Sequence, residues 1–461
     1  MRKTEITNAD ELVRLDRKHA FHHLAQHKVF ETQEPLIMVE GKGCMLKDIR
    51  GREYLDGTSG GVWCVNVGYG QDSIAEAVCE QLKKMPYYAP AAGNIPAVLM
   101  AEKVTSFLPN IDRLYISNSG SEANEKAFKM SRQYNRLKYP EKDKYKIIYR
   151  HRDYHGTTIT ALSATGQPER KTGYEPFVPG FLEIPAADCY RCPFDKSYPN
   201  CNIECARALE TIINLEGADT VAAVIMEPIT AGGGILIPVD EYFPVLQEIC
   251  RKYDVLLIID EVVCGFGRTG KMFGHQHFKV DPDMVTMAKG MASAYMPMSA
   301  TAVKEDIFKA FLNDPSDKMG YFRDVSTYAG CAGSCAATLE TIRLMEEQDM
   351  CKKSEVMGEY LLESLKALQE SFPIIGDVRG KGLFAGIELV EDRKTKAPVN
   401  EKVMAQVVGS AMAEGVILGK MNRSVPGFNN VIQFAPALIV TKEEIDRMMS
   451  AARKGLEKVS K

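Results

Sequence analysis

The chain has 461 residues, of which 45% are hydrophobic and 26% charged, and its formal net charge is −4. This composition is typical of a globular protein, and the length suggests two or three domains. The net charge is slightly negative, so the sequence gives no sign of a basic surface that would bind nucleic acid. No window holds 18 consecutive apolar residues and residues 1–21 are polar, so we expect neither a membrane span nor a signal peptide, and a cytoplasmic location.

The N-terminal part predicts a helix within residues 10–30, a small β meander over 37–56, and helices at 73–85 and 95–107. Between the meander and the first of these helices lies the glycine-rich segment GTSGGVWCVNVGYG, which holds Trp63, the only tryptophan. Such a segment either lets two backbones approach closely or lines a pocket.

A short strand at 114–116 runs into Ser-Asn-Ser-Gly-Ser, and a helix then continues to about residue 136. The free N–H groups and positive dipole end of a helix N-terminus bind anions, and Gly120 would let a phosphate approach Ser121. The same residues would also make an ordinary N-cap without any ligand.

Polar side chains end three further apolar runs. Glu227 follows 221–226, Asp260 follows 255–259, and Lys289 follows 284–288, with helical segments at 204–215 and 242–253 between them. Buried strands that alternate with helices predict a parallel sheet, whose ligands lie beyond the carboxyl ends of the strands. A lysine paired with a carboxylate suits pyridoxal phosphate, which forms a Schiff base with the one and needs the other to keep its pyridine nitrogen protonated.

Two other patterns carry alternative interpretations. Gly265, Gly267 and Gly270 spell GxGxxG, but no amphipathic helix follows, so a nicotinamide oxidoreductase is the weaker hypothesis. Four cysteines form C-x2-C and C-x3-C pairs within 17 residues, which suits zinc in a non-catalytic scaffold, reduced thiols or a local disulfide. We expect no metal site; the four residues are Cys189, Cys192, Cys201 and Cys205.

Taken together, five motifs resemble the class III pyridoxal-phosphate aminotransferases, the ω-transaminase family. They are SGSEANE from Ser119, DYHG from Asp153, EP at Glu227, IIDEV with GFGRTG from Ile258, and AKG around Lys289. The resemblance covers nearly the whole chain and implies fold type I: a large domain with a mostly parallel seven-stranded sheet, and a small α+β domain formed from both chain ends. It also implies a homodimer with active sites at the subunit interface. The expected ranges are an N-terminal arm and part of the small domain at 1–65, the cofactor domain at 66–335, and the C-terminal domain at 336–461.

The resemblance also implies roles for single residues. Lys289 would carry the Schiff base and shuttle the proton, and Asp260 would pair with the pyridinium. The remaining implied cofactor contacts are Gly120 and Ser121 at the phosphate, Tyr154 and Val262 on the two ring faces, Glu227 behind them, and Thr327 at the neighbouring subunit's phosphate. Ping-pong kinetics follow from these roles.

Substrate choice depends on fewer residues. Tyr87 and Tyr88 precede Ala-Pro-Ala-Ala, where many ω-transaminases place aromatic residues. The family's carboxylate-binding arginine aligns near Gly419, where the nearby cations are Lys420 and Arg423; we expect Trp63, Tyr154 and Arg423 to contact substrate. The segment CYRCPF most resembles the taurine–pyruvate branch, which implies taurine as amino donor and pyruvate as acceptor. The alternatives are a transaminase of β-alanine or another ω-amino compound, an aminomutase or a decarboxylase.

Overall fold

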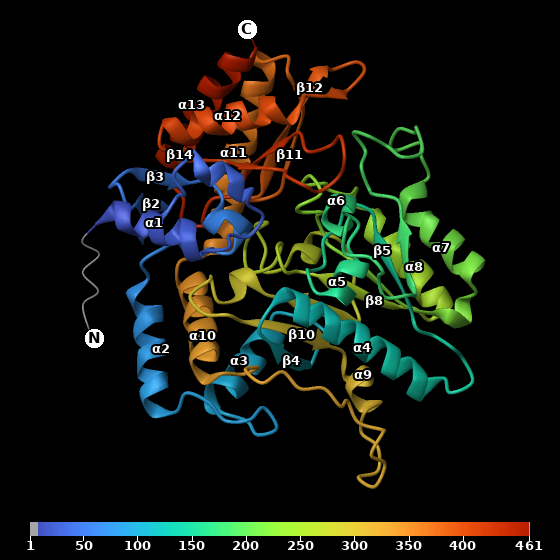
Figure 1. The fold of residues 1–461 in the computed structure, drawn as a ribbon. Coiled ribbons are helices and arrows are strands. Elements are labelled where there is room, and N and C mark those ends of the chain that lie inside the picture. Colours follow the sequence, from blue (N-terminus) through green and yellow to red (C-terminus); the bar gives the residue numbers. More distant parts are fainter. Residues whose placement is uncertain (1–7, 461) are drawn as a thin grey trace.

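A computed structural model describes residues 8–460 and is organised around one seven-stranded sheet (Figure 1). The strand order is β4-β10-β9-β8-β7-β5-β6, and every strand runs parallel to the others except β10, which pairs antiparallel with both neighbours. The bounds are Arg113–Ser117 (β4), Lys146–Arg150 (β5), Phe181–Ile184 (β6), Val221–Met226 (β7), Leu256–Asp260 (β8), Met284–Met287 (β9) and Ser299–Val303 (β10). The mostly parallel α/β sheet predicted above is therefore confirmed.

The central strands are apolar on both faces because helices cover both. Along β8, Leu257 packs in a cluster with residues of α7 (Glu204–Glu216) and α8 (Tyr242–Tyr253). The next residue, Ile258, points to the opposite face and packs with residues of α4 (Gly120–Lys138). This alternation is why the strand reads as a continuous apolar run in the sequence.

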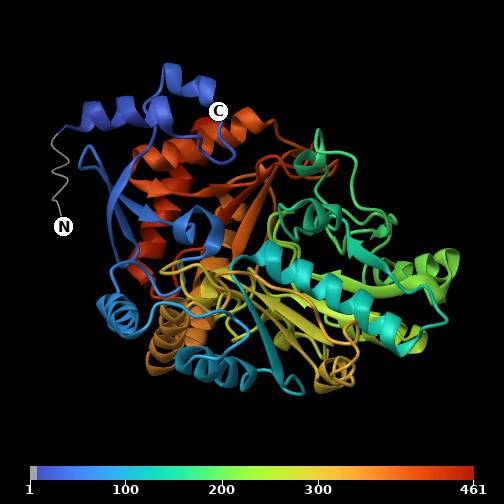
Figure 2. The ribbon, with the colours of Figure 1, turned by 60° about the horizontal axis from the view of Figure 1, so that its bottom comes forward.

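The two chain ends build a second unit together. In a four-stranded sheet, β1 (Met38–Lys42), β2 (Met45–Asp48) and β3 (Glu53–Asp56) are joined by β14 (Val416–Ile417), which runs parallel to β3. Figures 1 and 2 show the N-terminal strands in blue beside the C-terminal helices in red. The domain ranges 1–65, 66–335 and 336–461 stay predictions, and residues 1–7 and 461 lie outside the described part of the chain.

This second unit, called the C-terminal unit below, also contains a sheet made only of C-terminal strands, in the order β11-β12-β16-β15 with β13 beside β12. Its strands are Ile375–Gly380 (β11), Ala385–Asp392 (β12), Ala397–Pro398 (β13), Gly419–Lys420 (β15) and Val431–Phe434 (β16). The other helices of eight or more residues are Ala9–His19 (α1), Asp72–Lys84 (α2), Ile95–Thr105 (α3), Ala332–Glu347 (α10), Met350–Ser371 (α11), Glu401–Ala413 (α12) and Lys442–Val459 (α13). The short helices are Ile159–Ser163 (α5), Pro168–Lys171 (α6) and Glu305–Lys309 (α9). In the part of the chain that the structure describes, no helix is long and apolar enough to cross a membrane.

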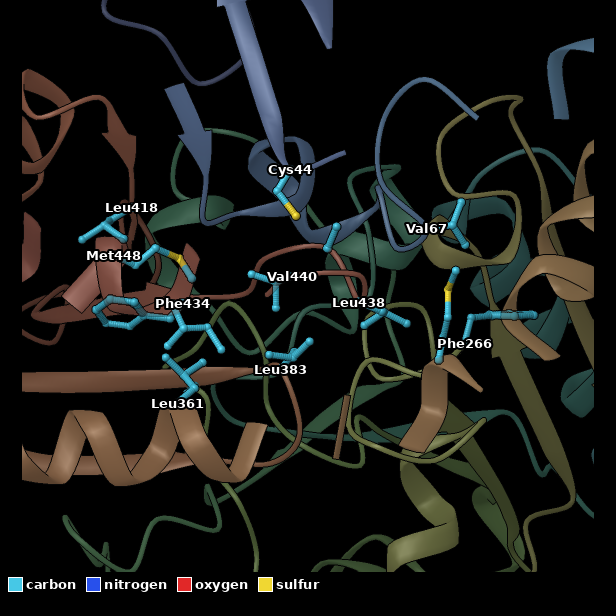
Figure 3. Packing of buried hydrophobic residues seen from close by; sticks show 14 of the residues in the cluster. Cys44, Val67, Phe266, Leu361, Leu383, Leu418, Phe434, Leu438, Val440 and Met448 are labelled. Atoms are coloured by element: carbon cyan, nitrogen blue, oxygen red, sulfur yellow. The ribbon is translucent and has the colours of Figure 1, made fainter. Parts of the chain in front are cut away.

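The GFGRTG loop joins the two units. Figure 3 shows Phe266 of this loop in the same apolar cluster as Leu438 of the C-terminal unit. Gly267 has φ +84°, and a Cβ there would lie 2.7 Å from a methyl carbon of Leu438. The buried guanidinium of Arg268 donates to the carbonyl oxygens of Leu383 (3.1 Å) and Pro436 (2.5 Å). Since only a four-residue 3-10 helix follows, at Gly274–His277, the loop lacks the strand-to-helix turn that a dinucleotide site needs.

Four local features differ from the sequence prediction. The sequence does not predict strands β6, β10 and β16, and the single strand expected at 378–390 is the β11–β12 hairpin. The first helix ends at His19, well before residue 30. The glycine-rich segment contains a π-helical turn, Ser59–Trp63, in which two glycines have positive φ. Strand β10 reads SATAV, whose small residues give weak strand signals although all five are buried.

Candidate active site

Three polar side chains lie at one edge of the large sheet. Strands β7, β8 and β9 are neighbours and run parallel, so their carboxyl ends coincide. Glu227 follows β7 directly, Asp260 is the last residue of β8, and Lys289 lies two residues beyond β9. Helix α4 begins nearby, because a Cβ on Gly120 would lie 3.0 Å from a methyl carbon of Val262 and 3.7 Å from the Cβ of Ala288.

Asp260 is buried and held by three hydrogen bonds. Its Oδ2 accepts from Asn124 Nδ2 and pairs with His155 Nδ1, each at 2.8 Å, while its Oδ1 accepts the backbone N–H of Val262 at 2.9 Å. Nε2 of His155 is buried without a partner among the described residues. These bonds fix the carboxylate's orientation. Asn124 and His155 lie in the SGSEANE and DYHG motifs, but the sequence assigns neither of them a role at Asp260.

Lys289 carries an amine that the fold disfavours in its charged form. Burial lowers the pKa of Lys289, against the opposing effects of Cys64 and of the carboxylates of Glu227 and Asp260. Its Nζ lies 5.1 Å from the centre of the Trp63 ring and makes no hydrogen bond to a described residue. The backbone of Lys289 has φ +45°, a strained conformation for a residue with a side chain, of the kind that clusters at functional sites.

Glu227 is a second buried acid at this edge. Its carboxylate accepts the backbone N–H groups of Tyr154 (2.9 Å) and Ala231 (3.1 Å). Burial, reinforced by the negative charges of Asp153 and Asp260, raises the pKa of Glu227 well above its ordinary value. The bond to Tyr154 positions that residue's backbone beside the strand ends.

The N-terminus of α4 has the cap that the sequence predicts. The Ser119 side chain accepts from the N–H of Glu122 at 3.3 Å. Ser121 Oγ accepts the N–H of Thr157 at 3.0 Å, which ties the helix start to the loop after Tyr154. The anion-binding role of Gly120 and Ser121 stays a prediction.

Three predicted contacts have less defined surroundings. Thr327 is exposed, and its neighbour Ser326 donates to a carboxylate oxygen of Glu122 at 2.7 Å, so the loop lies against α4 of its own chain. Lys420 belongs to β15 and pairs with Ile432. Arg423 donates from Nη1 to the carbonyl oxygen of Leu24 at 2.9 Å.

A cavity of about 450 Å³ adjoins Tyr154. It is lined by Phe21, His22, Leu24, Ala25, Tyr154, Thr157, Ile159, Leu162, Glu169, Arg170, Thr172, Tyr174 and Arg423. The guanidinium carbon of Arg170 lies 4.9 Å from the centre of the Tyr154 ring. Sequence reasoning missed Arg170, because nothing in the polar segment 166–173 shows that it folds back over Tyr154.

The four clustered cysteines lie together. All of them line one small cavity of about 20 Å³, and all are free thiols. Among residues 8–460, no group of three His, Cys, Asp or Glu side chains is placed to hold a metal ion. The adjacent Arg191 donates to Glu388 at 2.6 Å, so this segment contacts the C-terminal unit.

These residues fit pyridoxal phosphate. An amine with lowered pKa lies near a carboxylate that three donors orient, as a protonated pyridine ring requires. The N-terminus of α4 begins at Gly120, beside Val262, and a helix N-terminus can bind a phosphate. Because Gly120 has no Cβ, the space that a Cβ would fill next to Val262 stays open. The arrangement can therefore bind an anionic aromatic carbonyl compound and transfer protons beside it.

Comparisons with known proteins identify the family of the chain. Residues 27–456 match the family described as Aminotransferase class-III. A taurine–pyruvate aminotransferase of Bilophila wadsworthia (strain 3_1_6) is 52% identical over 449 residues, 97% of each chain. A hypotaurine/taurine–pyruvate aminotransferase of Paracoccus denitrificans (strain Pd 1222) is 50% identical, again over 97% of each.

Two solved structures show the same fold. A Bacillus anthracis aminotransferase has a TM-score of 0.93 at 41% identity, covering 97% of this chain and 98% of that one. An ω-transaminase from Pseudomonas jessenii in complex with PMP has a TM-score of 0.91 at 31% identity, with the same coverage.

Proposed function

The chain belongs to the class-III aminotransferases, and on that premise we propose that it transfers the amino group of taurine to pyruvate. The products would be sulfoacetaldehyde and alanine. The observation that supports this donor is the near-full-length similarity, at 52% and 50% identity, to aminotransferases named for taurine and pyruvate.

We propose pyridoxal phosphate as the cofactor. Lys289 would hold it covalently, Asp260 would face the ring nitrogen, and Gly120 with Ser121 would bind the phosphate. Tyr154 and Val262 would pack on the ring faces, with Glu227 behind them and Thr327 reaching the cofactor of the partner subunit. When bound, the cofactor would supply an electron sink for the carbanion formed at the donor's amine-bearing carbon.

The chain's own residues would control the protons. The donor's amine would first displace the Lys289 amine from the cofactor and so release it. The lowered pKa of Lys289 keeps a larger share of the released amine neutral near pH 7, so that it can remove the proton from the donor carbon as a base. Its conjugate acid would then return that proton to the cofactor. Asp260 would keep the ring nitrogen protonated because Asn124, His155 and the N–H of Val262 hold its carboxylate in a fixed orientation toward that nitrogen.

The second half of the reaction would use the same residues in reverse. Pyruvate would enter after sulfoacetaldehyde leaves, so we expect ping-pong kinetics. A donor whose only large group is an acid fits the absence of aromatic side chains after Tyr88, where the chain has Ala89, Pro90, Ala91 and Ala92. β-Alanine is the alternative donor, because it also places an acid two carbons from its amine.

We further propose a homodimer. Support comes from an exposed apolar surface around a cavity of about 450 Å³ that Tyr88, Val98 and Val325 line. The exposed fractions of these side chains are 64%, 61% and 72%, and large exposed apolar patches mark protein–protein contact surfaces. The partner subunit would cover them and receive Thr327.

A donor screen tests the proposed function. Purified enzyme loaded with pyridoxal phosphate is given pyruvate and one of taurine, β-alanine, 4-aminobutyrate or propylamine, and alanine is measured. We expect the highest kcat/KM with taurine. Alanine from β-alanine but not from taurine would show the alternative donor class, and no alanine from any donor would contradict transamination.

A further inference from the structure

Besides Arg423, the cavity beside Tyr154 contains a second cation, which the sequence did not point to. Arg170 belongs to the short helix α6 (Pro168–Lys171) and is partly buried against the Tyr154 ring. We propose that Arg170 binds the acidic head group of the amino donor and thereby selects donors that carry a sulfonate or carboxylate. This inference rests on the proposed function and identifies the residue that binds the negatively charged group of the substrate.

One edge of the Arg170 guanidinium is anchored by the protein. Its Nε donates to Gln167 Oε1 at 2.8 Å. Gln167 is fully buried, and its amide nitrogen donates to the carbonyl oxygen of Arg152 at 2.9 Å. The guanidinium is thus held at its Nε and over the Tyr154 ring, and its orientation is set before any substrate arrives.

The outer edge of the same guanidinium has no protein acceptor. Within residues 8–460, the one hydrogen bond from the Arg170 guanidinium is that of Nε to Gln167, so neither Nη atom has a protein partner. Glu169 also lines the cavity, but its carboxylate accepts from Asn429 Nδ2 at 2.6 Å. Two parallel N–H groups remain for a bidentate contact with two oxygens of one acid group.

Charge in the cavity favours an anion at this position. Burial lowers the pKa of Arg170, and the positive charge of Arg423 lowers it further. An anion between the two would relieve this repulsion. Arg423 differs because its Nη1 already donates to the Leu24 carbonyl, which leaves it less free to bind two oxygens.

Arg170 also lies within electrostatic reach of the reacting amine. Its charge contributes to the lowered pKa of Lys289. The guanidinium carbon of Arg170 also lies 4.9 Å from the centre of the Tyr154 ring, so we expect a small donor with an amine at one end and an acid at the other to extend from Lys289 to Arg170 along that ring. An amine without an acid group would gain nothing from Arg170.

The test measures binding separately from turnover. Calorimetry on the loaded enzyme would use 2-hydroxyethanesulfonate, which has the sulfonate but no amine to react. We expect Arg170→Gln to weaken binding about 10- to 100-fold, the loss of a charge-assisted bidentate contact, and Arg170→Lys to retain part of the affinity. The matched control is Lys171→Gln, which removes a neighbouring cation that contacts Tyr149 outside the cavity; it should change binding less than about twofold.

Turnover provides the second readout. Arg170→Gln should lower kcat/KM for taurine about 10- to 100-fold more than kcat/KM for propylamine, because propylamine has no acid group, while any effect of Arg170 on the Lys289 amine is common to both donors. Unchanged sulfonate binding in Arg170→Gln, or a loss confined to Arg423→Gln, would overturn the proposal. If the wild type makes alanine only from β-alanine, the taurine assignment fails but Arg170 must still bind 3-hydroxypropionate. A wild type that binds neither hydroxy acid would overturn the role of Arg170.

Discussion

The donors around Asp260 give a prediction with a matched control on one helix. Asn124 and Asn135 both belong to α4, and their exposed fractions are 1% and 2%. Asn124 donates to Asp260 at 2.8 Å and to the His155 carbonyl at 2.6 Å. Asn135 donates only to backbone carbonyls, those of Ser131 at 2.8 Å and Ala222 at 3.4 Å.

Alanine at either position should destabilise the cofactor-free protein by about 1–3 kcal/mol, because both changes remove a buried amide from its partners. Only Asn124→Ala removes a donor from the carboxylate that would face the ring nitrogen. A hydrogen bond to a charged group is worth about 1.5–3 kcal/mol, so cofactor affinity should fall about 10- to 150-fold in this variant.

Two titrations measure this difference. Urea unfolding of the cofactor-free variants gives the stability change, and a visible-absorbance titration with pyridoxal phosphate gives the affinity. Asn135→Ala should bind the cofactor within about twofold of wild type, since additivity holds for distant sites. Equal losses of cofactor affinity in both variants would refute the assigned role of Asp260 and its donors.

Three further predictions concern single residues. Burial lowers the pKa of Lys289 in the folded protein. Between this folded-state pKa and the lysine's ordinary pKa, the unfolded chain binds one more proton than the folded chain, so the stability of the cofactor-free protein should rise with pH over that range. Lys289→Met should remove this rise, at most about 1.4 kcal/mol per pH unit, in urea unfolding across alkaline pH; an unchanged slope would argue against it. Gly120→Ala places a methyl 3.0 Å from Val262 and should weaken cofactor binding by about 1–3 kcal/mol, with partial rescue by Val262→Ala; purely additive losses would contradict the packing. Gly267→Ala should lower the free energy of unfolding measured in urea, because a Cβ at this position would lie 2.7 Å from a methyl carbon of Leu438. The GxGxxG hypothesis is tested separately: the wild-type protein should show no fluorescence quenching when NADH is added.

The strand-end positions were accessible from sequence because burial leaves a direct pattern. β8 is apolar on both faces, so Asp260 stands out as the single charge where the run ends, and Lys289 does so after β9. The helix cap at Ser119 was accessible for a similar reason, since capping residues lie next to the helix that they begin. Local signals of this kind need no knowledge of the chain's path.

The residues that surround those positions were not accessible in the same way. Asn124 reaches Asp260 across 136 residues of sequence, and His155 reaches it across 105. Arg170 meets Tyr154 only because the 155–170 segment folds back. Strand β10 was missed because tertiary burial, rather than β-branched composition, makes its alanines and serine a strand.

Nitrogen transfer tests the central claim most directly. Loaded enzyme is incubated with ¹⁵N-taurine and unlabelled pyruvate, and both products are quantified by mass spectrometry. The account predicts ¹⁵N-alanine and sulfoacetaldehyde in equal amounts, with both lost in Lys289→Ala. Sulfoacetaldehyde without labelled alanine, or no reaction of taurine in enzyme that has bound its cofactor, would contradict taurine–pyruvate transamination.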